Sequence, residues 1–202
     1  MSRVRVRPTR EETRRRLFEA AADVFAKQGI GAASVEAITT TAGFTRGAFY
    51  SNFADMDELI AAMLADHIQQ TVGRYVELLA RHRDPDDFME ALRAVDRSTQ
   101  DPLGRSPLLH LELLLYSARA AEHRHELAEL LEARRRIIVD IVVGTGLSET
   151  GLGSLDPDQI AAILLAMEDG FRLHELIDPT RTPSDSFLRS ISALQQALRP
   201  DG

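Results

Sequence analysis

The 202-residue sequence predicts an all-α protein of about nine helices. Apolar residues recur at helical spacing along most of the chain, and no stretch shows the sustained apolar–polar alternation of a half-buried strand. Cap and turn residues, mainly Asp, Gly and Pro, divide this pattern into segments of ordinary helix length. Hydrophobic residues make up 44% of the chain, which is enough for a buried core.

The first helix is expected to begin after Thr9. The Thr9 side chain can cap the helix, and Glu12, three residues later, completes the pattern of a capping box. Gly29 is a natural C-terminal stop. The apolar stripe of this helix consists of Leu17, Ala21, Val24 and Phe25.

Residues 34–53 form a helix-turn-helix pattern. Ser34 can cap a short helix that ends at Gly43, and a second short helical segment is expected from Thr45 to Phe53. Glycine supplies the backbone freedom that the turn requires. Four apolar residues can pack the pair against the first helix: Val35, Ile38, Phe44 and Phe49.

The rest of the chain continues as helices of varied length. Asp55 caps a long fourth helix that reaches about Leu79, with Glu58 as its capping-box partner, and Asp156-Pro157 opens a strongly apolar helix. A glycine-rich loop is expected at 144–154. The other helices are expected around 88–95, in one or two segments between 108 and 143 divided near 121–124, and at 157–177 and 184–198.

Composition excludes several classes of protein. The chain has no cysteine, which excludes disulfide scaffolds, zinc ribbons, thiolate nucleophiles and iron–sulfur clusters. No apolar run approaches the roughly 18 residues that a membrane span needs, and the first residues lack the apolar core of a secretory signal. We therefore expect a cytoplasmic protein with no metal site and no cofactor.

Charge is distributed unevenly along the chain. The formal net charge is −7, yet basic residues outnumber acidic ones in the first 54 residues, and the remainder is strongly acidic. This asymmetry indicates a small basic unit facing a polyanion, attached to an acidic body with another task. The same charges would also suit a solvated N-terminal arm.

The second helix of the pair carries side chains suited to DNA. The Thr45 hydroxyl can contact a phosphate, Arg46 can reach a guanine edge or a phosphate, and Tyr50 can contact the DNA backbone. Asn52 can bond a phosphate or an adenine edge. The exposed side is otherwise slim, as a groove about 12 Å wide requires; its small residues are Gly47, Ala48 and Ser51.

The run 43–53, followed by the acidic cap and Leu59, resembles the TetR-type transcriptional regulators. Phe25–Ile30, together with Ala33-Ser34-Val35 and Ile38, is similar to the same family, so that the specific resemblance covers about residues 10–64. It implies a homodimer with two N-terminal DNA-binding domains, residues 1–54. It also implies a helical effector-binding and dimerisation domain, residues 55–202, and repression of an operator that a small molecule relieves.

The resemblance also assigns residues to the DNA interface: Ser34, Thr45, Arg46, Gly47, Ala48, Tyr50, Ser51 and Asn52. The chain departs from the family pattern at Met56, where the family commonly has a lysine that contacts phosphate. We expect the arginines of residues 3–16 to replace that contact. Ser51 is also smaller than the residue often found there, so the base preference does not transfer.

The last two apolar helices are the best candidates for a dimer interface. Two such helices from each subunit would form an intersubunit four-helix bundle, and dimerisation doubles the contacts on a palindromic operator. The same stripes could instead face only their own core. The predicted interface residues are Ile160, Ile163, Leu164, Met167, Phe171, Phe187, Ile191 and Leu194.

Polar residues between apolar neighbours in the body could anchor a ligand. A pocket among helices needs an apolar lining with a few polar groups. The abundance of Leu, Ile, Met and Phe favours an apolar or aromatic effector. The candidate pocket residues are Met63, His67, His110, Tyr116, Arg119, Asp169 and Arg172.

An enzyme and a helical scaffold protein are the two other classes of function to weigh against this sequence. Catalysis is disfavoured because the chain has no G-x-S-x-G elbow, no H-E-x-x-H and no Walker A loop, and because His123 and His125 lie on different helix faces. A helical ligand-binding or scaffold protein whose helix-turn-helix does not read DNA remains the alternative.

Overall fold

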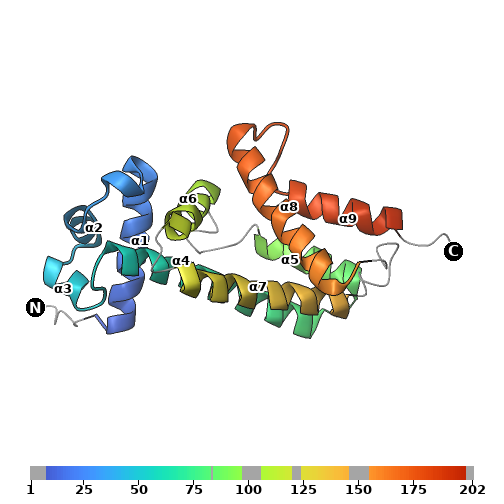
Figure 1. Cartoon of the computed structure of the whole chain (residues 1–202), viewed down its shortest axis with the longest axis horizontal. Coiled ribbons are helices and arrows are strands. Elements are labelled where there is room, and N and C mark those ends of the chain that lie inside the picture. Colours follow the sequence, from blue (N-terminus) through green and yellow to red (C-terminus); the bar gives the residue numbers. More distant parts are fainter. Residues whose placement is uncertain (1–7, 83, 97–105, 120–123, 146–154, 199–202) are drawn as a thin grey trace, which may run out of the picture.

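The computed structural model describes residues 8–82, 84–96, 106–119, 124–145 and 155–198. All secondary-structure elements in this part of the chain are helices, and it contains no strand. Helices α1–α3 form a head at one end of an elongated molecule, and α8 and α9 lie toward the other end (Figure 1). The elements are α1 (Arg10–Gln28), the 3-10 turn η1 (Ile30–Ala32), α2 (Val35–Ala42), α3 (Arg46–Tyr50), α4 (Met56–Arg81), α5 (Pro85–Asp96), α6 (Pro107–Arg119), α7 (Arg124–Gly144), α8 (Pro157–Ile177) and α9 (Ser186–Leu198).

Local capping chemistry sets the ends of these helices. The Thr9 hydroxyl accepts a hydrogen bond from the Glu12 amide at 3.1 Å, and the Glu12 carboxylate accepts one from the Thr9 amide at 2.7 Å. The predicted capping box is thus confirmed, as is the stop at Gly29. At α4 the Asp55 cap is confirmed, but the Glu58 carboxylate accepts from the Ala54 amide instead of the Asp55 amide.

The turn between α2 and α3 depends on Gly43. This residue has φ +68° and ψ +33°, a left-handed conformation that side chains with a Cβ rarely adopt. The Thr45 side chain then caps α3 by accepting from the Ala48 amide at 3.3 Å. The third helix is shorter than the predicted 45–53, because regular helix ends at Tyr50.

One apolar core joins the head to the first turns of the body. Leu17, Ile38 and Phe49 are fully buried in the head. The same cluster includes Leu59 of α4 and Leu113 of α6, so that packing is continuous across residue 54. The domain boundary that we expect there therefore divides the chain by composition and not by a gap in its core.

Two arginines of α1 fasten the helix-turn-helix to that core. The Arg16 guanidinium lies 4.5 Å from the Phe44 ring centroid and donates to the Ala42 carbonyl at 2.7 Å. Arg14 lies 4.6 Å from the Phe53 ring centroid. Such cation–π contacts at partly buried sites stabilise by about 0.5–2 kcal/mol. These two side chains thus have an intramolecular role.

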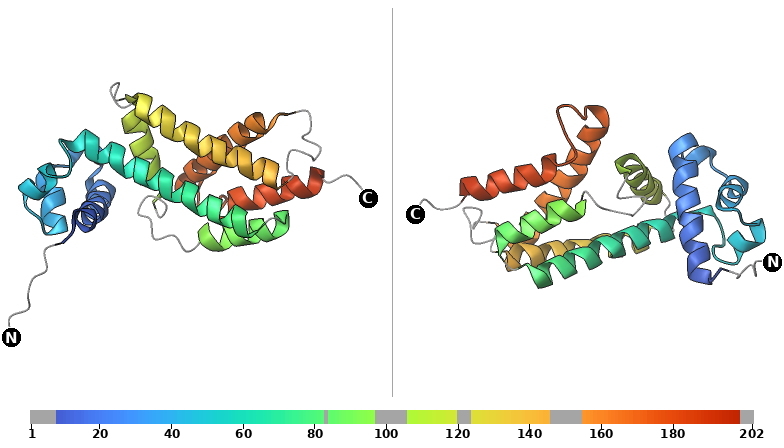
Figure 2. Two further views of the ribbon diagram at one scale, coloured as in Figure 1. Left: turned by 90° about the horizontal axis from the view of Figure 1, so that it is seen from below. Right: turned by 180° about the vertical axis from the view of Figure 1, so that it is seen from behind.

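The body is a bundle in which α7 lies along α4 and α8 packs on α7 (Figure 2). Asp156 caps α8 in a capping box with Gln159, and Pro157 occupies the first turn, as predicted. Helices α6 and α7 are two separate helices, where one or two segments were expected from the sequence. The residues between them lie outside the described part of the chain. The predicted loop at 144–154 also lies mostly outside them.

Candidate functional site

The exposed face of α3 brings a cation and a phenol together. Thr45, Arg46 and Tyr50 are all exposed, and the Arg46 guanidinium lies 6.0 Å from the Tyr50 ring centroid. A hydrogen bond with the Tyr50 hydroxyl, helped by the charge of Glu36, raises the pKa of Arg46 above its ordinary value. Arg46 therefore keeps its charge at every physiological pH, on a surface that is open to a polyanion.

Two exposed cap hydroxyls lie at the starts of α2 and α3. The Ser34 hydroxyl accepts from the Ala37 amide at 3.2 Å, and the Thr45 hydroxyl accepts from the Ala48 amide. Each hydroxyl still has its own proton, which it can donate to a phosphate oxygen. Both residues are exposed, so capping and a DNA contact are compatible.

Small residues keep the face of α3 slim. Gly47 and Ser51 are exposed and Ala48 is half-buried. The Ser51 hydroxyl donates to the Ala48 carbonyl at 2.9 Å, which draws the side chain against its own helix. The face therefore has the low profile that insertion into a major groove requires.

Asn52 departs from the prediction that it contacts DNA. Its side chain is only 8% exposed, and its amide donates to the Ala48 carbonyl at 2.8 Å. A second hydrogen bond runs from this amide to the Ser51 hydroxyl at 3.3 Å. Asn52 thus closes the end of α3, and its sequence position alone did not reveal that it is buried.

The structure describes only some of the arginines that we expect to replace the missing phosphate-contacting lysine. Met56 is half-buried against the head core and offers no charge. Arg14 and Arg16 make the intramolecular contacts described above, whereas Arg10 and Arg15 are exposed. The remaining arginines of this group, Arg3, Arg5 and Arg7, lie outside the described residues.

The body contains an apolar cavity of about 60 Å³ between α4, α5, α7, α8 and α9. Its walls are formed by aliphatic and aromatic side chains, and the carboxylate-bearing Glu168 adds a polar group. None of the seven candidate pocket residues given above lines this cavity, and most of its lining consists of apolar residues that look like ordinary core residues in sequence. The lining includes Tyr75, Phe88, Met89, Leu92, Val142 and Phe187.

Most of the predicted ligand residues lie elsewhere. Met63 is buried in the core that joins head and body, and Arg119 is exposed in the last turn of α6. The Tyr116 hydroxyl donates to the Asp57 carboxylate at 2.5 Å, which ties α6 to the first turn of α4. Among the seven predicted ligand residues, Arg172 lines a second cavity, which is described below.

A buried ionic cluster lies beside the cavity. The two oxygens of Glu168 accept from two different arginines, Arg134 at 2.5 Å and Arg172 at 2.6 Å. Burial would raise the pKa of Glu168, but the positive charges of Arg172 and Arg134 outweigh it and lower that pKa to about 2. The carboxylate therefore remains ionised inside the body.

His110 is buried and Asp169 half-buried near this cluster. The His67 and His110 rings are 4.9 Å apart. Burial, reinforced by Arg172, lowers the pKa of His110 to about 3, so that its imidazole is neutral at pH 7. Burial also raises the pKa of Asp169.

The predicted dimer residues divide into three sets by their exposure. Ile160 and Ile191 are buried within their own subunit, which corrects the expectation that they form an interface. Leu164, Met167, Phe171 and Phe187 are half-buried. Ile163 and Leu194 are exposed, at 47% and 44%.

An exposed apolar stripe continues along α8 beyond the predicted set. Leu173 is 49% exposed and Ile177 is 72% exposed. With Ile163 and Gly170 they follow the spacing of one helix face. Extending the apolar i, i+3, i+7 spacing from Ile163 to the end of the helix would have predicted Leu173 and Ile177 from the sequence.

Comparison with known proteins places this geometry in a family. Residues 17–63 match the family described as bacterial regulatory proteins, tetR family. This segment of the chain is therefore a TetR-type DNA-binding domain. The matched residues span α1, the helix-turn-helix and the start of α4.

The TetR assignment extends to relatives that align with most of the chain. The HTH-type transcriptional regulator TtgR of Pseudomonas putida is 28% identical over 197 residues, which cover 86% of each chain. SrpR of the same species is 28% identical, over 76% of this chain and 81% of its own. A regulator from Saccharomonospora viridis, solved in complex with choline, shares the fold with a TM-score of 0.74 at 17% identity, covering 92% of this chain and 96% of its own.

These TetR-family relatives distinguish a transcriptional regulator from an enzyme and from a helical scaffold protein. The protein is a DNA-binding transcriptional regulator and not an enzyme. Within the residues that the structure describes, no helix is both long and apolar enough to span a membrane.

Proposed function

We propose that this TetR-family protein is a repressor that binds an operator as a homodimer and is released by a small molecule. The observation that carries the proposal is the exposed face of α3, where Thr45, Arg46 and Tyr50 lie together. Ser34, Gly47, Ala48 and Ser51 complete the proposed DNA surface. Residues 1–54 would bind DNA, and residues 55–202 would bind the effector and the second subunit.

The apolar cavity is the proposed effector site. Its lining suits an apolar or aromatic molecule. With a volume of about 60 Å³, it must enlarge to admit an organic effector, so that binding has to displace surrounding helices. Helix α4 supplies Tyr75 to the wall and begins at the head, which makes it a direct mechanical link.

Helix α6 supplies a second link. It carries His110 beside the ionic cluster and Tyr116, which bonds the first turn of α4. A shift of α8 on effector binding would therefore reach the head through both helices. Half-sites lie about 34–36 Å apart, so a change of a few ångströms in head spacing would cost one set of contacts. A coupling of about 1–3 kcal/mol is typical of such regulation.

Replacing Arg46 with alanine tests the DNA-binding surface. If Arg46 reads a base, the variant should bind the operator about 1–3 kcal/mol more weakly, while binding to random DNA changes less. Binding is measured with a fragment from upstream of the protein's own gene at several salt concentrations, because the phosphate contribution falls steeply with salt.

Arg181→Ala is the matched control, since Arg181 is an exposed arginine of the turn before α9. It removes the same charge from the body and should leave operator affinity unchanged. Equal operator affinity for Arg46→Ala and the wild type would refute the proposed DNA surface.

Replacing Ile163 with glutamate tests the proposed dimer interface. A charge placed in an apolar intersubunit bundle should be strongly unfavourable, so that the variant should sediment as a monomer and bind the operator weakly. Val76→Glu on α4 is the control, because Val76 is 48% exposed on another helix and should leave the dimer intact. A dimeric Ile163→Glu protein would exclude this interface.

A further inference from the structure

A second small cavity adjoins the apolar one. It has a volume of about 50 Å³ and shares four lining residues with the first. These shared residues form the wall between the two cavities, so that a movement of their side chains would join the cavities as two lobes of one site: Tyr75, Leu92, Glu168 and Phe187. The first lobe forms the apolar end of the site, and the second lobe forms an end with a different lining.

The second lobe is more polar than the first. Arg172, Glu175 and Ser184 line it, next to the turn between α8 and α9. The Arg172 side chain, which forms part of this lining, is 22% exposed. One of its five N–H groups bonds Glu168. Arg172 can therefore donate further hydrogen bonds to a molecule in this lobe.

The buried carboxylate of the site is already neutralised. Both oxygens of Glu168 accept from arginines, and its side chain is only 9% exposed. Two guanidinium groups thus share one carboxylate, and the half-buried Asp169 carboxyl, whose pKa is raised by burial, lies close enough to act on both arginines. A cationic group would gain little from Glu168, whereas an anionic oxygen beside Arg172 would gain a bidentate partner.

We propose that the effector is an amphipathic carboxylate, with its apolar part in the first lobe and its carboxylate on Arg172 in the second. Ser184 also lines the second lobe, and its hydroxyl can donate a further hydrogen bond. This inference rests on the proposed effector function and names the chemical class of that effector.

Three probes that differ only in their polar end test the proposal: octanoate, 1-octanol and octylamine. Binding to the full-length wild-type protein is measured by calorimetry at pH 7 without DNA. Octanoate should bind about tenfold or more tightly than 1-octanol, because a charge-assisted hydrogen bond in a partly buried site adds that much. Octylamine should bind more weakly than both. Equal affinities, or tighter binding of octylamine through Glu175, would overturn the proposal.

Variants then locate the carboxylate. Arg172→Lys keeps the charge beside Glu168 but loses the planar fork, and it should reduce the preference for octanoate over octanol by severalfold. Ser184→Ala, at an exposed position, should reduce it less, and Arg181→Lys should not change it. A folded Arg172→Lys protein that retains the full preference would also overturn the proposal.

The two levels of the proposal fail in different ways. If 1-octanol and octanoate bind equally and both release the operator, the protein has an effector site for apolar molecules and only the carboxylate is wrong. If octanoate binds tightly without any change in operator affinity, the carboxylate site stands and the proposed release of repression is wrong.

Discussion

Replacing Glu168 with glutamine is expected to lower the free energy of unfolding by about 3–5 kcal/mol. The change removes a single negative charge, and with it the carboxylate that bonds the buried guanidinium groups of both Arg134 and Arg172. Desolvated charges are costly when they are unpaired, and glutamine can accept through only one oxygen. Urea unfolding at pH 7 and fixed protein concentration measures the loss, since a dimer's stability depends on its concentration.

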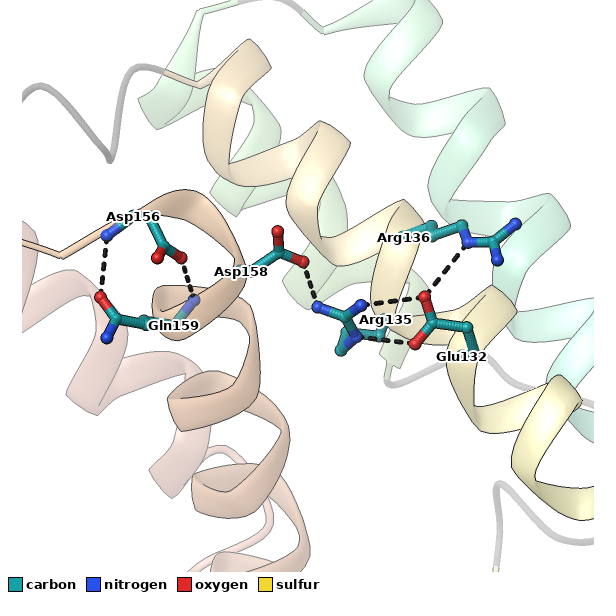
Figure 3. Close-up of polar contacts among 6 residues, drawn as sticks. All are labelled: Glu132, Arg135, Arg136, Asp156, Asp158 and Gln159. Atoms are coloured by element: carbon teal, nitrogen blue, oxygen red, sulfur yellow. Dashed lines mark hydrogen bonds and ion pairs between the residues drawn. The ribbon is translucent and has the colours of Figure 1, made fainter.

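A carboxylate with as many arginine contacts but a side chain that is 38% exposed provides the control. Glu132 of α7 accepts from Arg135 at 2.9 Å and from Arg136 at 3.2 Å, and Arg135 also contacts Asp158 of α8 (Figure 3). Solvent screens this network, so Glu132→Gln should cost far less than Glu168→Gln. Equal losses in the two variants would show that burial does not set the value of the Glu168 cluster.

Local signals were sufficient to predict the head. The Thr9 capping box, the Ser34 and Thr45 caps and the left-handed Gly43 depend on residues within four positions of one another, so that the sequence contains all the partners. The helix-turn-helix and the exposed residues of α3 followed from them. Asn52 was misplaced because its burial depends on how the end of α3 packs, which no local pattern specifies.

The body was predictable only as a set of helices. Ile160 and Ile163 lie on the same apolar helix, but only packing against α7 decides that Ile160 is buried and Ile163 exposed. Glu168 and Arg134 are 34 residues apart and bond across two helices. Both the cavity and its ionic cluster depend on such long-range contacts, and no spacing in the sequence encodes them.

Acidification from pH 7 to pH 5 is expected to destabilise the protein by about 2 kcal/mol through His110 alone. The unfolded chain binds a proton at this imidazole near its ordinary pKa of 6.5, whereas burial and the charge of Arg172 lower the pKa in the folded state to about 3. The folded state therefore stays unprotonated while the unfolded state gains a proton, and stability falls by about 1.4 kcal/mol for each pH unit below 6.5.

The surroundings of His110 determine this direction. Arg172 of α8, His67 of α4 and Arg134 of α7 all disfavour a charge on the imidazole, and only Glu168 favours one. Glu168 itself, with a folded-state pKa of about 2 against 4.5 unfolded, begins to reduce stability only below about pH 4.5. The loss between pH 7 and pH 5 can therefore be assigned to histidine.

His110→Leu separates this histidine from the other five. Neither imidazole nitrogen of His110 has a hydrogen-bond partner in the described part of the chain, so leucine should be tolerated at pH 7. The variant should lose much less stability than the wild type between pH 7 and pH 5 in urea unfolding. His174→Gln, at an exposed position of α8, should keep the wild-type pH dependence. Parallel curves of stability against pH for His110→Leu and the wild type would mean that the folded state binds a proton at His110 near the ordinary pKa. The burial of His110 and the charges of Arg172 and Arg134 argue against that outcome.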